Sequence, residues 1–260
     1  MKKIITIISM LFLISLSSFS QEKPLVVGME LAYPPFEMTD AKGNPTGISV
    51  DMAKALGEYL GRDIVIENMG YGGLIPALKT KKVDIILSSM TITDQRKKSI
   101  NFSDPYAKSY LTLLVSKRSP VKRPSDLNTR GVNIAVKKGT TGHVVATKLF
   151  PKANIMVFEK ESVCVLEVTQ GKADAFIYDP LTVFKNWKKN PNTTRPIFDQ
   201  FQKDVEYWGV GYRHGEDALG REINGFIKEF KESGGFDKLA EKYLTEQKKT
   251  FDEKGLPFFF

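Results

Sequence analysis

Two periodicities alternate along the chain, and this alternation constrains its fold more than any other feature of the sequence. Short apolar runs of strand length alternate with segments whose apolar residues recur at the three- and four-residue spacing of an amphipathic helix. In the first half, the pattern strand, helix, strand, helix, strand covers residues 24–31, 51–62, 63–69, 74–82 and 83–90. Strands that alternate with helices in this way predict an α/β fold with parallel strands.

A second series of the same kind follows a turn-rich stretch at residues 119–128. Its strands and helices are expected at residues 132–139, 141–150, 154–160, 162–170 and 173–179. The two series predict two similarly wound lobes, although any two αβ units can resemble each other by chance. Residues 109–117 lead out of the first series, and residues 205–213 lead back to C-terminal helices at 216–234 and 236–244. We therefore expect two hinge strands and a ligand site in the cleft, where strands end.

The net charge of +8, from 38 Lys and Arg against 30 Asp and Glu, can indicate a nucleic-acid or acidic partner. Part of this charge belongs to residues 1–20, where two lysines precede an apolar run from Ile4 to about Leu16 and small residues follow. This layout predicts a secretory signal peptide that is cleaved after Ser20. An uncleaved membrane anchor is the alternative, but the run is shorter than the ~20 residues that span a bilayer.

Export would place the protein in the periplasm and exclude nucleic acid as a partner. No cysteine lies near the expected cleavage site, so we expect no lipid anchor. The chain also lacks a G-x-S-x-G turn, an H-E-x-x-H pair and a phosphate-binding loop. His143 and His214 are expected to be surface or packing residues, and Cys164 a buried, inert thiol. We therefore expect no catalytic residue, metal or cofactor.

Polar side chains follow the apolar part of the strand expected at 83–90. They are the hydroxyls of Ser89 and Thr91 and, a few residues further on, the guanidinium of Arg96. A guanidinium is a planar fork that binds a carboxylate through two parallel hydrogen bonds. Arg96 is therefore a candidate for binding a small acid, while a solvated arginine at a helix start is the open alternative.

Polar side chains also follow the strands expected in the second series. Thr141 opens a helix whose free N–H groups favour an anion, although it would also serve as an ordinary helix cap. Asp179 can hold an ammonium group or cap the helix that starts near Pro180. Tyr33 and Tyr71 lie on loops, where aromatic rings sandwich a ligand side chain or pack the lobes. An anion clamp opposite a cation acceptor suits a zwitterion with one carboxylate and one ammonium.

Four segments closely resemble the polar amino-acid family of extracellular solute-binding proteins, whose members feed ABC importers. They are AYPPFE (32–37), GISVDMAKAL (47–56), the run 71–106 that contains SSMTITDQR, and IAVKKGTTG (134–142). The resemblance covers about residues 24–244 and implies a two-lobed, periplasmic-binding-protein-like type II α/β fold. Each lobe would be a mixed sheet flanked by helices.

The resemblance also implies an organisation and a set of partners. We expect lobe 1 over residues 21–111 and 210–260 and lobe 2 over residues 112–209, joined by two hinge strands. The expected partners are a polar amino acid and the permease of an ABC importer. We expect a monomer that meets the membrane only through that permease.

In the family, the position of Arg96 binds the ligand α-carboxylate, and the resemblance implies that Thr91 and the Thr141 turn assist it. Asp179 is similar to the family's acceptor of the α-ammonium group, to which Ser89 and its backbone contribute. Tyr33 and Tyr71 are similar to the family's aromatic pair around the ligand side chain. The resemblance alone implies these roles, which fall on Arg96, Thr91, Thr141, Asp179, Ser89, Tyr33 and Tyr71.

Three further positions, Glu30, Lys137 and Tyr178, resemble those that select the ligand side chain in the family. Glu30 favours a cationic tip, as in arginine, lysine or histidine, whereas Lys137 favours a carboxylate or an amide oxygen. If Glu30 and Lys137 pair with each other, the pocket is nearly neutral. The resulting prediction is a polar amino acid, glutamine-like before cationic.

Two other functions stay open at this point. Secreted cyclohexadienyl dehydratases, which act on prephenate or arogenate, share the family fold and need a general acid, for which Glu30 or Glu161 is a candidate. A protein that senses an amino acid for a membrane receptor is the third possibility. The tail GLPFFF (255–260) is expected to pack on the first lobe, with association as the alternative.

Overall fold

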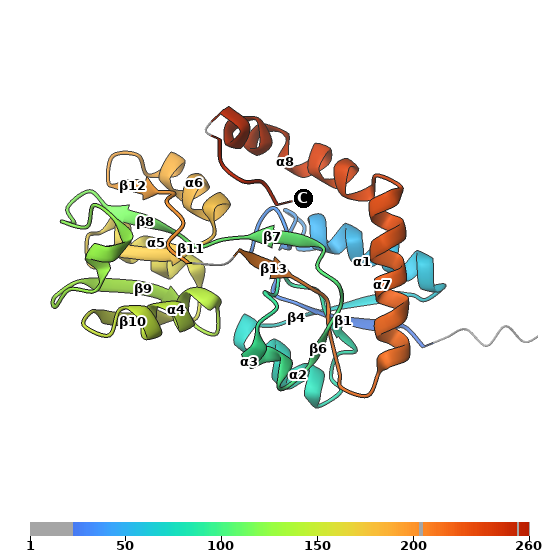
Figure 1. The fold of residues 1–260 in the computed structure, drawn as a ribbon. Coiled ribbons are helices and arrows are strands. Elements are labelled where there is room, and N and C mark those ends of the chain that lie inside the picture. The colour runs from blue at the N-terminus through green and yellow to red at the C-terminus, as the bar shows by residue number, and fades with distance from the viewer. Residues whose placement is uncertain (1–22, 203–204, 254, 260) are drawn as a thin grey trace, which may run out of the picture.

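The computed structural model describes residues 23–202, 205–253 and 255–259, so the expected signal peptide lies outside the described residues. The described chain forms two lobes, each built on a five-stranded sheet with helices packed against it (Figure 1). This architecture confirms the predicted two-lobed α/β fold. Within the described ranges, no helix is both long and apolar enough to cross a membrane.

The sheet of the first lobe has the strand order β4-β1-β5-β14-β6. Strand β1 pairs in parallel with β4 and β5, as the alternation of strands and helices predicts, whereas β14 runs antiparallel to β5 and β6. Leu25, Val27 and Met29 of β1 are fully buried, because helices cover the sheet. The elements are β1 (Leu25–Met29), β2 (Met38–Thr39), β3 (Pro45–Thr46), α1 (Ile48–Leu60), β4 (Ile64–Asn68), α2 (Leu74–Lys79), β5 (Ile85–Ile86), α3 (Asp94–Lys97), β6 (Asn101–Phe102) and β14 (Gly211–Tyr212).

The sheet of the second lobe has the order β10-β9-β11-β8-β12. Strands β10, β9 and β11 are parallel, whereas β8 runs antiparallel to β11 and β12, so the sheet is mixed as expected. Cys164 is fully buried in this lobe, and burial raises the pKa of its thiol to about 12, which fits an inert cysteine. The elements are β8 (Thr112–Ser116), β9 (Asn133–Lys137), α4 (Thr141–Leu149), β10 (Asn154–Phe158), α5 (Glu161–Thr169), β11 (Ala175–Tyr178), α6 (Pro180–Lys189) and β12 (Thr194–Ile197).

Two short strands connect the lobes, β7 (Ala107–Ser109) and β13 (Glu206–Trp208), and they pair antiparallel with each other (Figure 1). The chain was expected to cross between the lobes over residues 109–117, but most of that segment is β8, a fully buried strand of the second sheet. Its apolar residues Leu113, Leu114 and Val115 explain the difference, because they need cover on both faces. The crossing itself is shorter and lies one strand earlier.

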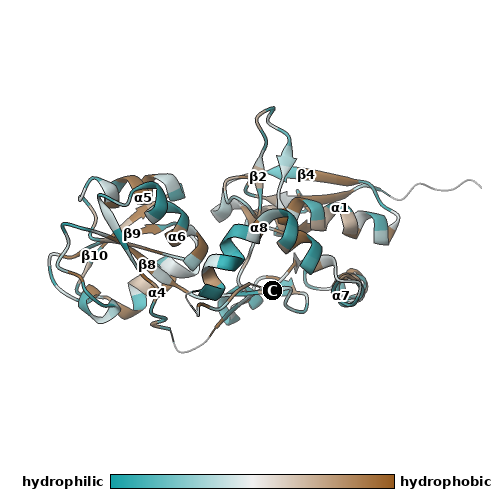
Figure 2. Ribbon diagram, turned by 90° about the horizontal axis from the view of Figure 1, so that it is seen from above, coloured by the Kyte–Doolittle hydropathy of each residue, from teal (hydrophilic) through white to brown (hydrophobic). Residues whose placement is uncertain are grey.

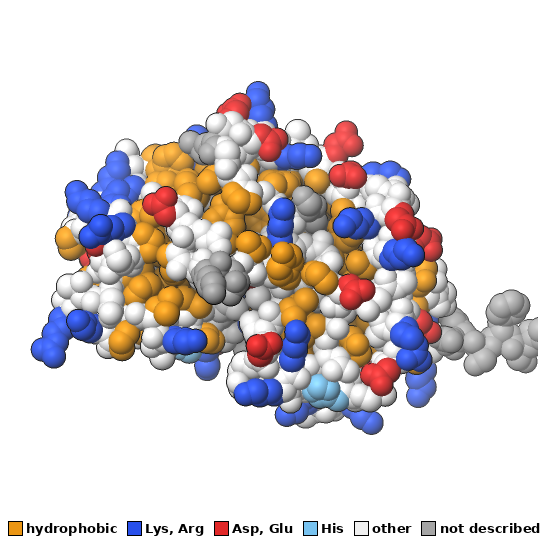
Figure 3. All heavy atoms as spheres, viewed as in Figure 1, with side chains coloured by type: hydrophobic (Ala, Val, Ile, Leu, Met, Phe, Trp, Pro, Cys, Tyr) orange, Lys and Arg blue, Asp and Glu red, His pale blue; other side chains and the backbone are white. Residues whose placement is uncertain are grey.

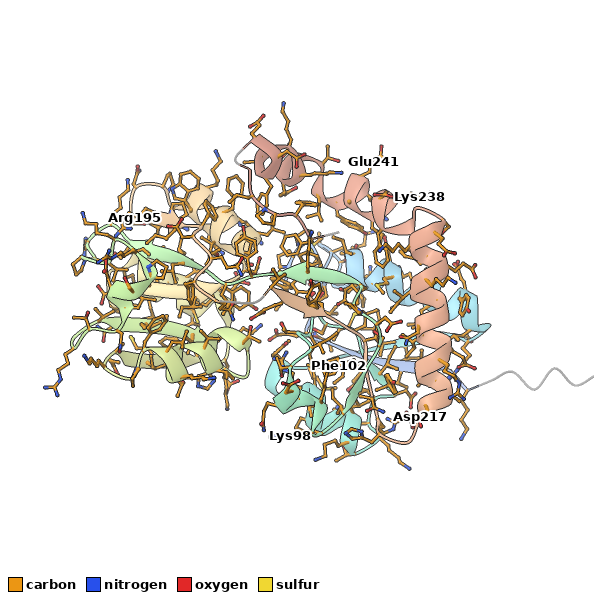
Figure 4. The ribbon with its side chains drawn as sticks, viewed as in Figure 1. Lys98, Phe102, Arg195, Asp217, Lys238 and Glu241 are labelled. Carbon is orange, nitrogen blue, oxygen red and sulfur yellow. The ribbon has the colours of Figure 1, made fainter. Side chains whose placement is uncertain are left out.

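Helices α7 (Asp217–Glu232) and α8 (Gly235–Glu253) follow the return to the first lobe. Helix α8 extends nine residues beyond the expected end at Leu244, since no helix-breaking residue occurs before Gly255. Leu244 is buried, whereas Lys238 and Glu241 project from α8 away from the lobe (Figure 4). Figure 2 shows hydrophilic residues on the outer side of α8, whereas strand β4 consists mainly of hydrophobic residues.

Lysine and arginine side chains are spread over the surface of both lobes (Figure 3). Over residues 112–209 the sequence has 16 Lys and Arg against 9 Asp and Glu, and the rest of the chain after residue 20 has 20 against 21. The positive excess therefore belongs to the segment that contains the second sheet. The net charge of the whole chain therefore says little about the few charged residues in the cleft.

The C-terminal tail packs on the first lobe, which confirms the expectation for residues 258 and 259. Phe259 is 2% exposed, and its ring lies 5.1 Å from that of Phe36 and 5.4 Å from that of Trp208. The backbone N–H of Lys108 in β7 donates to the Phe259 carbonyl at 2.9 Å. The tail thus packs beside the hinge strands.

Truncation of the Phe259 side chain should destabilise the protein. Loss of a buried phenylalanine ring leaves a cavity and typically costs about 3 to 5 kcal/mol, so Phe259→Ala should lower the free energy of unfolding in urea by about that amount. Phe258→Ala is the matched control, because Phe258 is only half-buried and should cost less. Equal and negligible effects of both variants would show that the tail does not contribute to the core.

Candidate functional site

A cavity of about 490 Å³, counting its open mouth, lies between the two lobes. Its walls come from segments that follow strands of both sheets and from the hinge strand β13. Nine of the ten residues predicted to bind the ligand line it: Glu30, Tyr33, Tyr71, Ser89, Thr91, Lys137, Thr141, Tyr178 and Asp179. The folding of two separate sheets toward one cleft therefore brings these residues together.

Arg96, the tenth predicted residue, lies beside this cavity and lines an adjoining groove. Its guanidinium donates to the carbonyl of Thr91 at 2.6 Å, to the hydroxyl of Tyr71 at 3.2 Å and to the carbonyl of Gly139 at 3.0 Å. Gly139 belongs to the second lobe, so Arg96 reaches across the cleft. A merely solvated arginine would not be held in this way, and Arg96 is half-buried.

The hydroxyls of Thr91 and Thr141 meet at one carboxylate, that of Glu206 in the hinge strand β13. Thr91 Oγ1 donates to Glu206 Oε2 at 3.0 Å, and Thr141 Oγ1 donates to the same oxygen at 2.9 Å. The residue that caps helix α4 is Thr140, whose hydroxyl accepts from the N–H of His143. The capping role considered for Thr141 is therefore wrong, and its hydroxyl faces the cleft instead.

Asp179 combines the two roles that the sequence left open. Its Oδ1 accepts from the backbone N–H of Thr182 at 2.9 Å and so caps helix α6. Its Oδ2 is buried and has no partner with hydrogen-bond geometry among the described residues. The Tyr33 hydroxyl lies close to the Asp179 carboxyl and acts to lower its pKa. Burial raises the pKa of the Asp179 carboxyl. This oxygen lines the cavity as an acceptor that an ammonium group would satisfy.

Ser89 lines the cavity at an unusual point of the backbone. It has a φ of 47°, in the left-handed region that is uncommon for residues other than glycine, and the chain turns away from the sheet here. This turn explains why the strand expected over 83–90 is regular only at Ile85–Ile86. The Ser89 hydroxyl donates to Glu37 at 3.1 Å, which leaves its oxygen able to accept from a ligand ammonium group.

Glu37 is a buried carboxyl that sequence reasoning missed as a site residue. Its oxygens accept hydrogen bonds from Ser49 at 2.6 Å, from Ser89, and from Ser88 at 3.3 Å. Burial raises the pKa of Glu37 to about 8, even though these hydroxyls favour the charged form. The residue stands inside the recognised segment AYPPFE, but its serine partners come from distant segments and give no local pattern.

Aromatic rings from both lobes line the cavity. Tyr33 of the first lobe meets Tyr178 of the second edge-on, with ring centroids 5.8 Å apart at 81°. Tyr33 also packs on Phe36 and Trp208, so it serves in lobe packing as well as in the cavity wall. The Lys137 ammonium lies 5.4 Å from the centroid of the Tyr71 ring. Trp208 is a further lining residue that the sequence did not single out.

Glu30 and Lys137 form an ion pair across the cleft. Glu30 directly follows the end of strand β1, and Lys137 is the last residue of β9, so the pair joins the carboxyl ends of the two sheets. The Lys137 side chain is 2% exposed and that of Glu30 is 12% exposed. A charge buried to this extent needs an opposite charge, and each residue supplies it to the other.

Two lobes, two connecting strands and a lined cavity between them match the architecture of two-lobed solute-binding proteins. The sequence matches the family of bacterial extracellular solute-binding proteins, family 3, over residues 25–246, and the chain belongs to this family. The L-arginine-binding protein of Pseudomonas aeruginosa is 30% identical over 243 residues, which are 90% of this chain and 93% of that protein.

Solved structures of amino-acid-binding proteins are also similar to this chain. An ancestral amino acid-binding protein, AncCDT-1, a precursor of cyclohexadienyl dehydratase, is 37% identical with a TM-score of 0.78, over 85% of this chain and 95% of that chain. An ancestral arginine-binding protein bound to glutamine is 32% identical with a TM-score of 0.77, over 85% and 97% of the two chains. Both neighbours are named as binding proteins.

The raised pKa of Glu37 predicts how stability depends on pH. The folded chain keeps this proton up to about pH 8, whereas an unfolded carboxyl releases it near 4.5, so Glu37 lowers stability progressively between these values. Glu37→Gln carries no titrating group, and its melting temperature should rise relative to the natural chain between pH 5 and pH 9. At about 1.4 kcal/mol per pKa unit, the roughly three units of this shift that fall above pH 5 make the relative gain about 4 kcal/mol.

The control for this comparison is Glu222→Gln on the exposed side of α7, which should show no such trend. A constant difference between Glu37→Gln and the natural chain across this pH range would contradict the raised pKa.

Proposed function

We propose that the protein is an exported solute-binding protein that captures a polar, uncharged L-amino acid between its lobes, glutamine before cationic amino acids, and delivers it to an ABC importer. The observation that carries this choice of ligand is the Glu30–Lys137 pair. Because the two charges neutralise each other, the pair offers neither a free carboxylate to a cationic side chain nor a free ammonium to an acidic one.

The remaining charges in and beside the cavity match the backbone end of an amino acid. Arg96 is the cation for the α-carboxylate, with the hydroxyls of Thr91 and Thr141 beside it. Asp179 offers its unpartnered Oδ2 to the α-ammonium group. Tyr33, Tyr71 and Tyr178 provide ring surface for the side chain. Closure of the lobes removes water from these contacts and so strengthens the charge-assisted hydrogen bonds.

We further propose where the protein acts and with which partner. The family consists of extracellular proteins, which supports a periplasmic location after cleavage of residues 1–20, and an importer permease as the partner of a monomer. We take residues 21–111 and 210–260 as lobe 1 and residues 112–209 as lobe 2. In support, every strand of the second sheet lies between residues 112 and 197.

Two observations favour a second candidate function, a cyclohexadienyl dehydratase activity. The structural relative AncCDT-1 is a precursor of that enzyme, and Glu37 is a cavity carboxyl that holds a proton up to about pH 8, as the raised pKa implies. The acids suggested by the sequence suit this role less well. Glu30 is paired with Lys137, and Glu161 does not line the cavity. Phenylpyruvate formation from prephenate, lost in Glu37→Gln, is the result that would establish the enzyme.

Calorimetric titration with the standard L-amino acids tests the proposed ligand class. Glutamine should bind more tightly than arginine, lysine or histidine, because the Glu30–Lys137 pair leaves no net charge for a charged side chain. Tight binding of arginine with none of glutamine would contradict the proposed order.

Truncation of the two groups assigned to the backbone end should abolish most of the affinity. Arg96→Ala and Asp179→Ala should each cost several kcal/mol, on the order of 2 to 5, because each leaves a ligand charge unpaired in a buried site. Arg221→Ala on the exposed side of α7 is the matched control and should bind like the natural chain. Unchanged affinity in either cleft variant, measured on a protein that melts normally, would refute its assigned role.

A further inference from the structure

The end of the second lobe that points away from the cleft is built from four loops. Strands β9, β10 and β11 run parallel, and Lys137 at the end of β9 and Asp179 just after β11 line the cavity. The amino ends of these strands therefore point away from the cavity, together with the carboxyl end of the antiparallel strand β8. The loops at this end, here called the outer loops, are residues 117–132, 150–153, 170–174 and 190–193.

The outer loops carry most of the positive excess of this lobe. They hold seven of the 16 Lys and Arg residues of the segment 112–209, but only two of its 9 Asp and Glu residues. Both carboxylates are engaged, because Asp126 pairs with Arg123 and Asp174 accepts from the backbone N–H of Asn133 at 2.8 Å. The other six cations are exposed and form no ion pair with a described residue: Lys117, Arg118, Lys122, Arg130, Lys152 and Lys172.

The corresponding end of the first lobe is not charged in this way. Residues 61–63 and 80–84, which precede β4 and β5, hold three cations and two carboxylates. One of these cations, Lys82, pairs with Glu67 at 2.7 Å. In Figure 3, which has the second lobe on the left, Lys and Arg side chains predominate over Asp and Glu at the left end. The positive end is therefore a feature of the second lobe alone.

Helix capping explains only a small part of this charge. Lys152 and Lys172 follow the ends of helices α4 and α5, where a cation complements the partial negative charge of the helix terminus. The other five cations lie in residues 117–132, which follow strand β8 and no α-helix. Their clustering has no explanation within the fold.

The composition of the outer loops indicates the kind of partner. Interfaces between proteins centre on aromatic and other large apolar side chains, and lysine is depleted there. Among the described residues, none of the large hydrophobic side chains that are exposed lies in an outer loop. Anionic lipid headgroups need no such anchor, because long cationic side chains are attracted to the negative potential of the bilayer, and each contributes about fivefold to the binding constant.

We propose that the outer loops of the second lobe form an electrostatic contact surface for the headgroups of anionic phospholipids. The surface lies at the opposite end of the lobe from the cavity, so lipid contact leaves the solute site free. This contact goes beyond the proposed function, in which the protein meets the membrane only through a permease. For a protein that serves an importer, the attraction raises its concentration beside the membrane that holds the importer, and this consequence alone rests on the proposed function.

Co-sedimentation with lipid vesicles tests the surface directly. At about 0.1 M salt the exported chain should bind vesicles that contain phosphatidylglycerol but not vesicles of phosphatidylcholine alone. The binding should disappear at about 1 M salt, because the screening length falls from about 10 Å to about 3 Å. The neutral vesicles also report any contribution from the apolar run at residues 4–16. Absence of binding to the anionic vesicles at low salt would overturn the proposal.

A triple variant locates the contact on the molecule. Lys117→Gln combined with Arg118→Gln and Lys172→Gln should bind the anionic vesicles at least tenfold more weakly than the natural chain, since three exposed cations are lost. No amino acid is present in this experiment, so its result is independent of the solute that the cleft binds. A failure of the proposed function and a failure of this inference are therefore distinguishable.

The matched control is Lys79→Gln combined with Lys97→Gln and Lys98→Gln, which removes the same charge from exposed positions of the first lobe. This variant should bind like the natural chain. Equal weakening by both triple variants would show that net charge, and not the outer loops, determines binding, and would overturn the proposal. Binding of the natural chain to immobilised poly-L-glutamate but not to anionic vesicles would assign the outer loops to an acidic polypeptide and would overturn it as well.

Discussion

The buried ion pair between Glu30 and Lys137 is the contact on which the geometry of the cleft depends. Each residue stands at the carboxyl end of a strand, one in each lobe. Both side chains are buried, so each charge needs the other to offset the cost of its desolvation. The pair therefore holds the ends of the two sheets together, and it also decides the charge that a ligand side chain meets. One interaction thus links the arrangement of the lobes to the choice of ligand.

With Glu30 and Lys137 neutralised by each other, other charged residues are left to meet the ligand. Arg96 and Asp179 remain as one cation and one anion for the two ends of a zwitterion, while burial keeps Glu37 protonated up to about pH 8. Glu206 is a further carboxylate in the cavity wall, and it accepts hydrogen bonds from Thr91 and Thr141. A cleft with this balance suits an amino acid whose side chain is polar but uncharged.

Much of this could be predicted from the sequence, because the positions depend on local patterns. Thr91 and Asp179 follow an apolar strand and Lys137 ends one, and parallel strands direct their carboxyl ends to one side of a sheet. The family resemblance supplied their expected roles, and nine of the ten residues line the cavity. Arg96 is displaced into the neighbouring groove because its guanidinium is bound to backbone carbonyls and to Tyr71.

The residues that were missed depend on contacts between distant segments. Glu206 lies 115 positions from Thr91 and 65 from Thr141, and it was expected only as part of a connection. Glu37 accepts hydrogen bonds from serines that lie 12 and more positions away, so no local pattern marks it as a site residue. The end of α8 was misplaced for a different reason, since apolar periodicity fades after Leu244 although no residue stops the helix before Gly255.

The central claim is that the Glu30–Lys137 pair sets the ligand class, and the most direct measurement is the ratio of affinities for L-glutamine and L-arginine in the natural chain and in Lys137→Met. Removal of the ammonium leaves Glu30 unpaired, so the variant should bind arginine more tightly than glutamine, whereas the natural chain should do the reverse. Glu30→Gln combined with Lys137→Met, which removes both charges, should return the preference to glutamine. The same order of affinities in all three proteins would contradict the account.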